Sequence, residues 1–142
     1  MPDLADLQNS FPESFVYYKP KDVVSGDFYW FDTVGDTSLL AVVDCTGHGV
    51  PGAFMSIVGY NGLNRAVGDH NKTTPGEILD DLNDSVTGTL RQQEDQNAVK
   101  DGMDLALCSI DLKSRILQYA GANNPLYVIR SCKEPHIEGR EI

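Results

Sequence analysis

The chain has 142 residues, of which 21 are acidic and 11 are basic, and its formal net charge is −10. This length suits one domain with its own hydrophobic core. The negative charge argues against binding to duplex nucleic acid, because such binding needs lysine and arginine to neutralise phosphates. No apolar run approaches the roughly 20 residues of a membrane-spanning helix, and the N-terminus lacks the layout of a secretory signal. We therefore expect a cytoplasmic protein with no membrane segment and no nucleic-acid partner.

The first half of the chain predicts a short lead-in followed by strands. Residues 1–10 are expected to form a linker or a short helix, and residues 15–18 are aromatic and β-branched, as in a strand. A second strand is predicted at 26–31 and a third at 38–43, with the turn signal Gly35-Asp36 between them. These two strands should form a hairpin. The third is continuously apolar, which predicts burial on both of its faces.

The second half predicts two helices and then three more strands. Pro51 marks the start of the first helix, while Thr74 and Glu77 form a capping box at the start of the second. A polar loop is expected at 91–100, and strands are expected at 104–111, 116–120 and 126–130. Sequential hairpins with two long helices between them favour an α+β fold with antiparallel sheets over a doubly wound one.

The residues with the clearest chemistry lie at the glycine-rich corner that follows the third strand. Asp44 begins this corner, and Asp27 lies at the matching end of the preceding strand. Two carboxylates in these places could hold hard cations, which prefer oxygen ligands. The alternative is that an aspartate before glycine simply caps a helix or a turn. His48, between two glycines, has either an acid or phosphate-contact role or a packing role at the helix start.

The three cysteines, by contrast, show neither a CxxC pair nor zinc-ligand spacing. They are Cys45, Cys108 and Cys132. Their odd number also argues against a disulfide framework, so we expect reduced thiols.

Three ordered stretches resemble the SpoIIE-like bacterial branch of the metal-dependent protein phosphatases (PPM, the protein phosphatase 2C superfamily). They are KPKDVVSGDFYW at 19–30, VDCTGHGVPGAFM at 43–55 and YAGANNPL at 119–126. The resemblance runs from about residue 11 to residue 130. It implies a β-sandwich of antiparallel sheets with helices on both outer faces.

The resemblance also implies the site and the reaction. Asp27, Asp44 and the backbone carbonyl of Cys45 would bind two Mn²⁺ or Mg²⁺ ions, with Asp27 and Asp44 as the catalytic residues. A metal-bound water would hydrolyse phosphoserine or phosphothreonine on a protein in a bacterial signalling pathway, as expected for such water. The implied substrate is a STAS-type anti-sigma-factor antagonist.

One departure from the family pattern affects this expectation. The family's remaining metal aspartates lie in a C-terminal segment with an S/T-D-G motif, whereas residues 134–142 contain no aspartate. We therefore expect a phosphatase domain at 11–142 that is truncated at its C-terminus. Asp101 and Asp104 are candidates for an outer metal contact, or else ordinary loop and strand-start carboxylates.

Competing functions follow from the same residues. A non-catalytic regulatory or interaction module with this fold, or an inactive fragment, is the alternative to an active enzyme. Another two-metal phosphoester hydrolase, such as a nuclease, is disfavoured by the negative charge. In the family that the chain resembles, linkers that precede the phosphatase domain often dimerise. A homodimer that pairs through residues 1–10 is therefore a further expectation.

Overall fold

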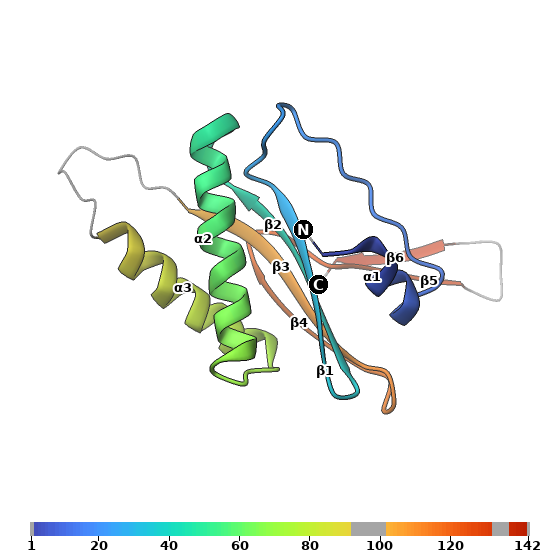
Figure 1. The fold of residues 1–142 in the computed structure, drawn as a ribbon. Helices are drawn as coiled ribbons and strands as arrows, with labels where there is room; N and C mark the ends of the chain where they lie inside the picture. The colour runs from blue at the N-terminus through green and yellow to red at the C-terminus, as the bar shows by residue number, and fades with distance from the viewer. Residues whose placement is uncertain (1, 92–101, 132–136, 142) are drawn as a thin grey trace.

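The computed structural model describes residues 2–91, 102–131 and 137–141. Three helices and six strands lie within these ranges. In chain order they are α1 (Leu4–Ser10), β1 (Phe28–Val34), β2 (Thr37–Cys45), α2 (Gly49–Gly68), α3 (Pro75–Arg91), β3 (Met103–Asp111), β4 (Ile116–Ala122), β5 (Tyr127–Ser131) and β6 (Ile137–Glu141). Figure 1 shows how they are arranged.

The first four strands form one antiparallel sheet in the order β1-β2-β3-β4. The predicted hairpin between β1 and β2 is confirmed, and Gly35 takes a φ of 60° in its two-residue turn. Such left-handed backbone favours glycine and matches the twist of hairpin strands. Strands β5 and β6 pair with each other as a separate two-stranded sheet.

Helices α2 and α3 pack against one face of the four-stranded sheet (Figure 1). From β2, the side chains of Leu39, Ala41 and Val43 point to this face and are at most 1% exposed. The indole nitrogen of Trp30 on β1 donates a 2.8 Å hydrogen bond to the side-chain oxygen of Asn64 on α2. The hydrophobic core therefore lies between the sheet and these two helices.

The opposite face of the sheet is only partly covered. Helix α1 and the segment 11–27 run across it (Figure 1), yet Val42 on β2 is 55% exposed. Our prediction that this strand is buried on both faces is therefore wrong for the part of the chain that the structure describes. Its alternate residues Leu39, Ala41 and Val43 meet the helices, whereas the residues between them line an open groove.

The predicted strand at 15–18 is also wrong. These residues are extended but belong to neither sheet. Phe15 is 86% exposed and Tyr17 is 81% exposed. Their β propensity reflects side chains that suit a pleated surface, and a strand also needs a hydrogen-bonded neighbour.

The predicted α+β class is confirmed, as are both long helices and the strands at 104–111, 116–120 and 126–130. The start of α3 follows the predicted capping region, where the amide of Ile78 donates to the carbonyl of Thr74. The loop predicted at 91–100 lies almost wholly outside the described residues. In the described ranges, none of the helices combines the length and apolar character needed to cross a bilayer.

Candidate metal centre

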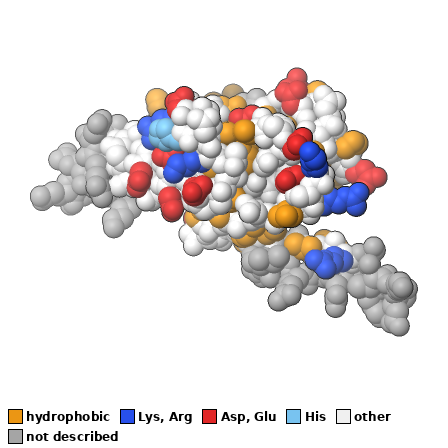
Figure 2. All heavy atoms as spheres, turned by 90° about the horizontal axis from the view of Figure 1, so that it is seen from below, with side chains coloured by type: hydrophobic (Ala, Val, Ile, Leu, Met, Phe, Trp, Pro, Cys, Tyr) orange, Lys and Arg blue, Asp and Glu red, His pale blue; other side chains and the backbone are white. Residues whose placement is uncertain are grey.

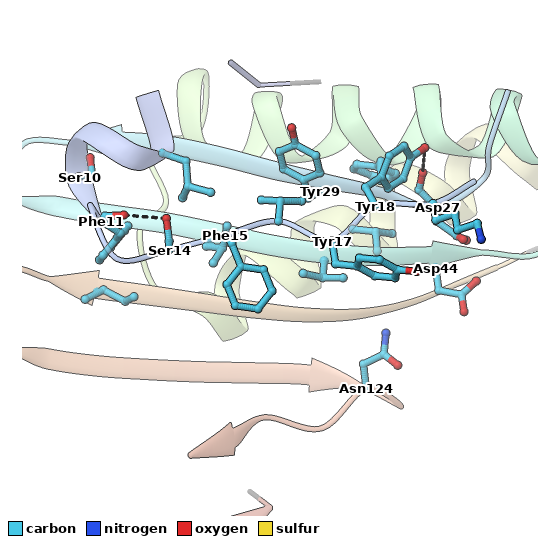
Figure 3. A pocket seen from close by; sticks show the side chains of 18 of the residues that line it. Ser10, Phe11, Ser14, Phe15, Tyr17, Tyr18, Asp27, Tyr29, Asp44 and Asn124 are labelled. Carbon is cyan, nitrogen blue, oxygen red and sulfur yellow. Dashed lines mark hydrogen bonds between the residues drawn. The ribbon is translucent and has the colours of Figure 1, made fainter. Parts of the chain in front are cut away.

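Asp27 and Asp44 lie side by side at one end of the β1–β2 hairpin. Phe28 on β1 is paired with Val43 on β2, so the next position along each strand is occupied by one of the two aspartates. Figure 3 shows both side chains at the same end of the groove on the open face of the sheet. The hairpin register thus brings together the two carboxylates that the sequence singled out.

The backbone of Asp27 is held on both sides. Its amide donates to the hydroxyl oxygen of Ser25 at 3.0 Å, and its carbonyl accepts from the hydroxyl of Tyr18 at 3.1 Å. Tyr18 itself packs edge-on against Tyr29 of β1. These contacts fix the approach of residue 27 to the sheet, although it precedes the first residue of the strand.

Three glycines meet where the corner joins helix α2. A Cβ atom added to Gly52 would lie 2.6 Å from the carbonyl oxygen of Gly47 and 3.2 Å from the Cα of Gly26. A Cβ added to Gly26 would lie 3.2 Å from the carbonyl oxygen of Cys45. Only residues without a side chain allow this approach. The glycines therefore draw the start of α2, the corner and the chain entering β1 into direct contact.

The electrostatics of the site centre on Asp44. Partial burial, the charge of Asp27 and a side-chain hydrogen bond with Asp27 raise the pKa of the Asp44 carboxyl, with a smaller effect from Asp104. Burial and the charges of the same two aspartates at 27 and 44 raise the pKa of the Cys45 thiol to about 12. The Cys45 side chain is therefore a neutral, buried thiol, and only its backbone carbonyl can act as a hard-cation ligand.

The donor set suits Mg²⁺ or Mn²⁺. Asp27, Asp44 and the carbonyl of Cys45 supply oxygen atoms, which such cations prefer, and a bound cation would relieve the repulsion between neighbouring carboxylates. Among the described residues, no three His, Cys, Asp or Glu side chains converge closely enough to hold an ion by themselves. Water, backbone oxygen, substrate or residues outside the described ranges would supply the other ligands, since Mg²⁺ usually keeps several waters.

His48 lies at the start of α2 and does not point to a single role. It occupies the N-cap position but makes no side-chain capping hydrogen bond. Its Nδ1 lies 3.4 Å from a carboxylate oxygen of Asp22, and its side chain is 73% exposed. This pairing links the corner to the loop that precedes β1.

Asp104 joins the same end of the sheet from a third strand. It lies directly opposite Asp44 in the β2–β3 register, and its carboxylate accepts a 2.9 Å hydrogen bond from the side-chain amide of Asn123. The other candidate, Asp101, lies outside the described residues. Asn123 belongs to a stretch that the sequence marked, but its partner was not predicted, because that requires the register of β3 and β4.

Thr46 anchors the corner to the start of β3. Its hydroxyl accepts from the amide of Gly102 at 2.8 Å and donates to the carbonyl of the same residue at 3.0 Å. The Thr46 amide donates to that carbonyl as well. These bonds fix the entry of β3 beside the corner, so that Asp104 follows two residues later.

A groove of about 1140 Å³ runs from α1 to the carboxylates (Figure 3). Its floor includes Leu40, Val42 and Ile110 from the open face of the sheet. Residues 10–19 form the opposite wall, and Asp27, Asp44 and Asn124 lie at one end. The groove is thus mostly apolar, and it is acidic where the candidate metal centre begins.

Solved phosphatase domains share this architecture. The SiaA-PP2C domain of Pseudomonas aeruginosa is similar with a TM-score of 0.71 and 29% identity, over 90% of this chain and 55% of that chain. Two structures less than 25% identical share the fold. One is the structure of the RsbU and RsbW domains of Rv1364c from Mycobacterium tuberculosis, with a TM-score of 0.58 and 23% identity over 77% of this chain and 28% of that chain. The other is the PPM Ser-Thr phosphatase MsPP from Mycobacterium smegmatis, with a TM-score of 0.54 and 19% identity over 85% of this chain and 48% of that chain. The fold is therefore of the PP2C (PPM) phosphatase class.

Within that class, the family is also shown. Residues 35–140, well over half of the chain, match the Stage II sporulation protein E (SpoIIE) family. The chain belongs to the SpoIIE family. Comparison with curated protein sequences gives no match. The chain spans about half the length of the SiaA-PP2C chain that it matches.

Proposed function

We propose that this chain carries part of the site of a metal-dependent protein serine/threonine phosphatase in bacterial signalling. The observation that carries the proposal is the pairing of Asp27 and Asp44 at one end of the β1–β2 hairpin. Membership of the SpoIIE family and the PP2C fold support phosphatase chemistry over other uses of two carboxylates.

In this proposal, Asp27, Asp44 and the Cys45 carbonyl hold two Mn²⁺ or Mg²⁺ ions. When bound, such ions supply a Lewis acid that activates water and neutralises phosphate charge. The described residues of the chain contribute by holding the two aspartates in fixed positions. Ser25 and Tyr18 fix the backbone of Asp27, and the glycine junction fixes the corner that carries Asp44. Rigid placement of this kind is what lets a site act without rearranging during the reaction.

The proposed substrate is a phosphorylated protein, of the STAS anti-sigma-factor antagonist type, in the cytoplasm. Support comes from the SpoIIE family match and from the shared fold with an RsbU domain that occurs beside an RsbW domain in Rv1364c. We also propose that pairing of residues 1–10 from two copies of the chain makes the protein a homodimer.

Hydrolysis of an aryl phosphate and of phosphoserine peptides in Mn²⁺ tests the proposal. We expect turnover that stops in a chelator and falls by at least about 100-fold in Asp44→Asn, since even indirect partners of a metal contribute 10- to 100-fold. Asp36→Asn is the matched control, because this exposed aspartate lies in the turn at the other end of the hairpin. Its turnover should equal that of the unmodified chain.

Two results would contradict the proposal. Turnover that persists in a chelator would show that the reaction does not depend on a metal. Turnover in Asp44→Asn equal to that of the unmodified chain would show that Asp44 is not part of the site. Metal binding without turnover on any phosphopeptide would favour the non-catalytic interaction module instead.

A further inference from the structure

Asp104 faces the candidate metal centre from the strand next to β2. It is directly opposite Asp44 in the register of the antiparallel pair. Residues opposite each other in such a pair have Cβ atoms only about 4.5–5.5 Å apart. The charge of Asp104 also acts on Asp44. A carboxylate that is half-buried in this position contributes to the field felt by any cation held at Asp27 and Asp44.

Asn123 contacts that carboxylate directly. Its side-chain amide donates a 2.9 Å hydrogen bond to one oxygen of Asp104, and its backbone bridges to Leu105, the next residue along β3. Its φ of 62° lies in the left-handed region, which asparagine tolerates better than most residues. The side chain of Asn123 thus contacts Asp104 and its backbone contacts Leu105, so both parts of Asn123 bind the start of β3.

The arrangement fits an indirect role better than ligation. One oxygen of Asp104 already accepts the hydrogen bond from Asn123. Asp104 also does not converge with the other described carboxylates into a three-residue metal group. Partners of this kind orient a metal site and adjust its affinity through charge and hydrogen bonds.

We propose that Asn123 and Asp104 form a positioning pair, in which Asn123 orients Asp104 so that its charge strengthens cation binding at Asp27 and Asp44. The inference rests on the proposed function. The inference gives both residues a role at the site. Asp104 acts on the cation through its charge, and Asn123 acts only by orienting Asp104.

Mn²⁺ affinity, measured by calorimetry and by the electron paramagnetic resonance signal of free Mn²⁺, tests the pair without relying on turnover. Asp104→Asn should weaken binding roughly tenfold, the low end of what indirect partners contribute. The loss should shrink in about 0.5 M salt, because salt screens an interaction between partly exposed charges. Water-proton relaxation should give the same number of Mn²⁺-bound waters as in the unmodified chain.

The order within the pair is tested by Asn123→Gly, which removes the donor and keeps a residue that accepts the left-handed backbone. This change should weaken Mn²⁺ binding, and the double variant with Asp104→Asn should bind no more weakly than Asp104→Asn alone. The matched controls are Asn71→Gly, where an asparagine with φ of 54° lies in the α2–α3 loop, and Asp36→Asn. Both controls should bind like the unmodified chain.

Each other outcome overturns a defined part of the account. Independent, additive losses in the double variant would show that Asn123 does not act through Asp104. A changed number of bound waters, with a loss as large as in Asp44→Asn, would make Asp104 a ligand. Unchanged affinity in Asp104→Asn, with affinity lost in Asp44→Asn, would overturn the pair alone. No Mn²⁺ binding by the unmodified chain, or none lost in Asp44→Asn, would overturn the metal centre and the pair together.

Discussion

The glycines of the corner matter because of what they touch. Gly52 lies at the start of α2, where a Cβ would come within 2.6 Å of the Gly47 carbonyl oxygen. The oxygen belongs to the backbone, and the position of a Cβ is fixed by its own backbone, so neither atom could turn away as the end of a flexible side chain would. The two glycines thus contribute a close contact between the corner and the helix.

Gly52→Ala should therefore lower the free energy of unfolding by about 1–3 kcal/mol, the usual cost of overpacking. Gly88→Ala on α3 is the matched control, because nothing lies within 4 Å of its added Cβ. Alanine there should stabilise the chain by up to about 1 kcal/mol through helix propensity. Urea unfolding measures both, and equal effects of the two substitutions would contradict the contact.

The raised pKa of Asp44 predicts a pH dependence in metal-free protein. A carboxyl with a higher pKa in the folded state than its ordinary 3.8 binds more protons when folded. Its contribution to stability therefore decreases as pH rises through the interval above 3.8. Asp44→Asn lacks this ionisation, so with a chelator present it should exceed the unmodified chain in stability most at pH 7.

That difference should shrink as the pH falls toward the ordinary pKa, and thermal unfolding at a series of pH values measures it. Added Mn²⁺ should stabilise the unmodified chain and leave Asp44→Asn nearly unchanged. A stability difference that grows as the pH falls would contradict the sign of the shift.

The sequence was sufficient to bring Asp27 and Asp44 together because only one local hairpin separates them. The turn signal at Gly35-Asp36 sets the register of β1 and β2. The partnership of Asp104 with Asn123 needs the β3–β4 register and a left-handed residue after β4. No periodicity in the sequence encodes either of these, so the sequence named Asp104 as a candidate but could not predict its hydrogen bond with Asn123.

At the level of elements, β2 shows why burial is harder to predict than strand formation. Its apolar run correctly predicts a strand, yet only one face meets α2 and α3. A continuous run of apolar residues predicts a strand, but it does not specify which part of the chain covers the face of β2 that points away from α2 and α3. The prediction of a strand at 15–18 was wrong for a related reason, because a strand also needs a hydrogen-bonded neighbour that local composition does not specify.

The two faces of β2 should respond differently to substitution. Leu39 is 0% exposed, so Leu39→Ala should cost about 2–5 kcal/mol of stability through the cavity it leaves. Val42 is 55% exposed on the open face, and Val42→Thr should cost less than about 1 kcal/mol, as surface changes usually do. Chemical unfolding compares them. A cost at Val42 that equals the cost at Leu39 would mean that the second face is covered in solution.

At the scale of the whole molecule, charge separates this chain from nucleic-acid enzymes. Its net charge is −10, and on the face in Figure 2 the Lys and Arg side chains are interspersed with Asp and Glu rather than gathered in a stripe. The apolar groove ends at an acidic site. These features do not suit a polyanion held along its backbone.

We accordingly expect no detectable binding of duplex DNA or RNA near physiological salt. Fluorescence anisotropy with labelled duplexes measures this directly. Salt-dependent binding in the micromolar range would contradict the electrostatic argument and would revive the nuclease alternative.

We propose above all that Asp27 and Asp44 hold a divalent cation together. Calorimetric titration with Mn²⁺ tests it most directly, using the unmodified chain, Asp27→Asn, Asp44→Asn and the control Asp36→Asn. We predict binding by the unmodified chain and by the control, and a loss of at least about tenfold in affinity in each of the other two. Equal affinity in all four proteins, or binding by none of them, would contradict the account.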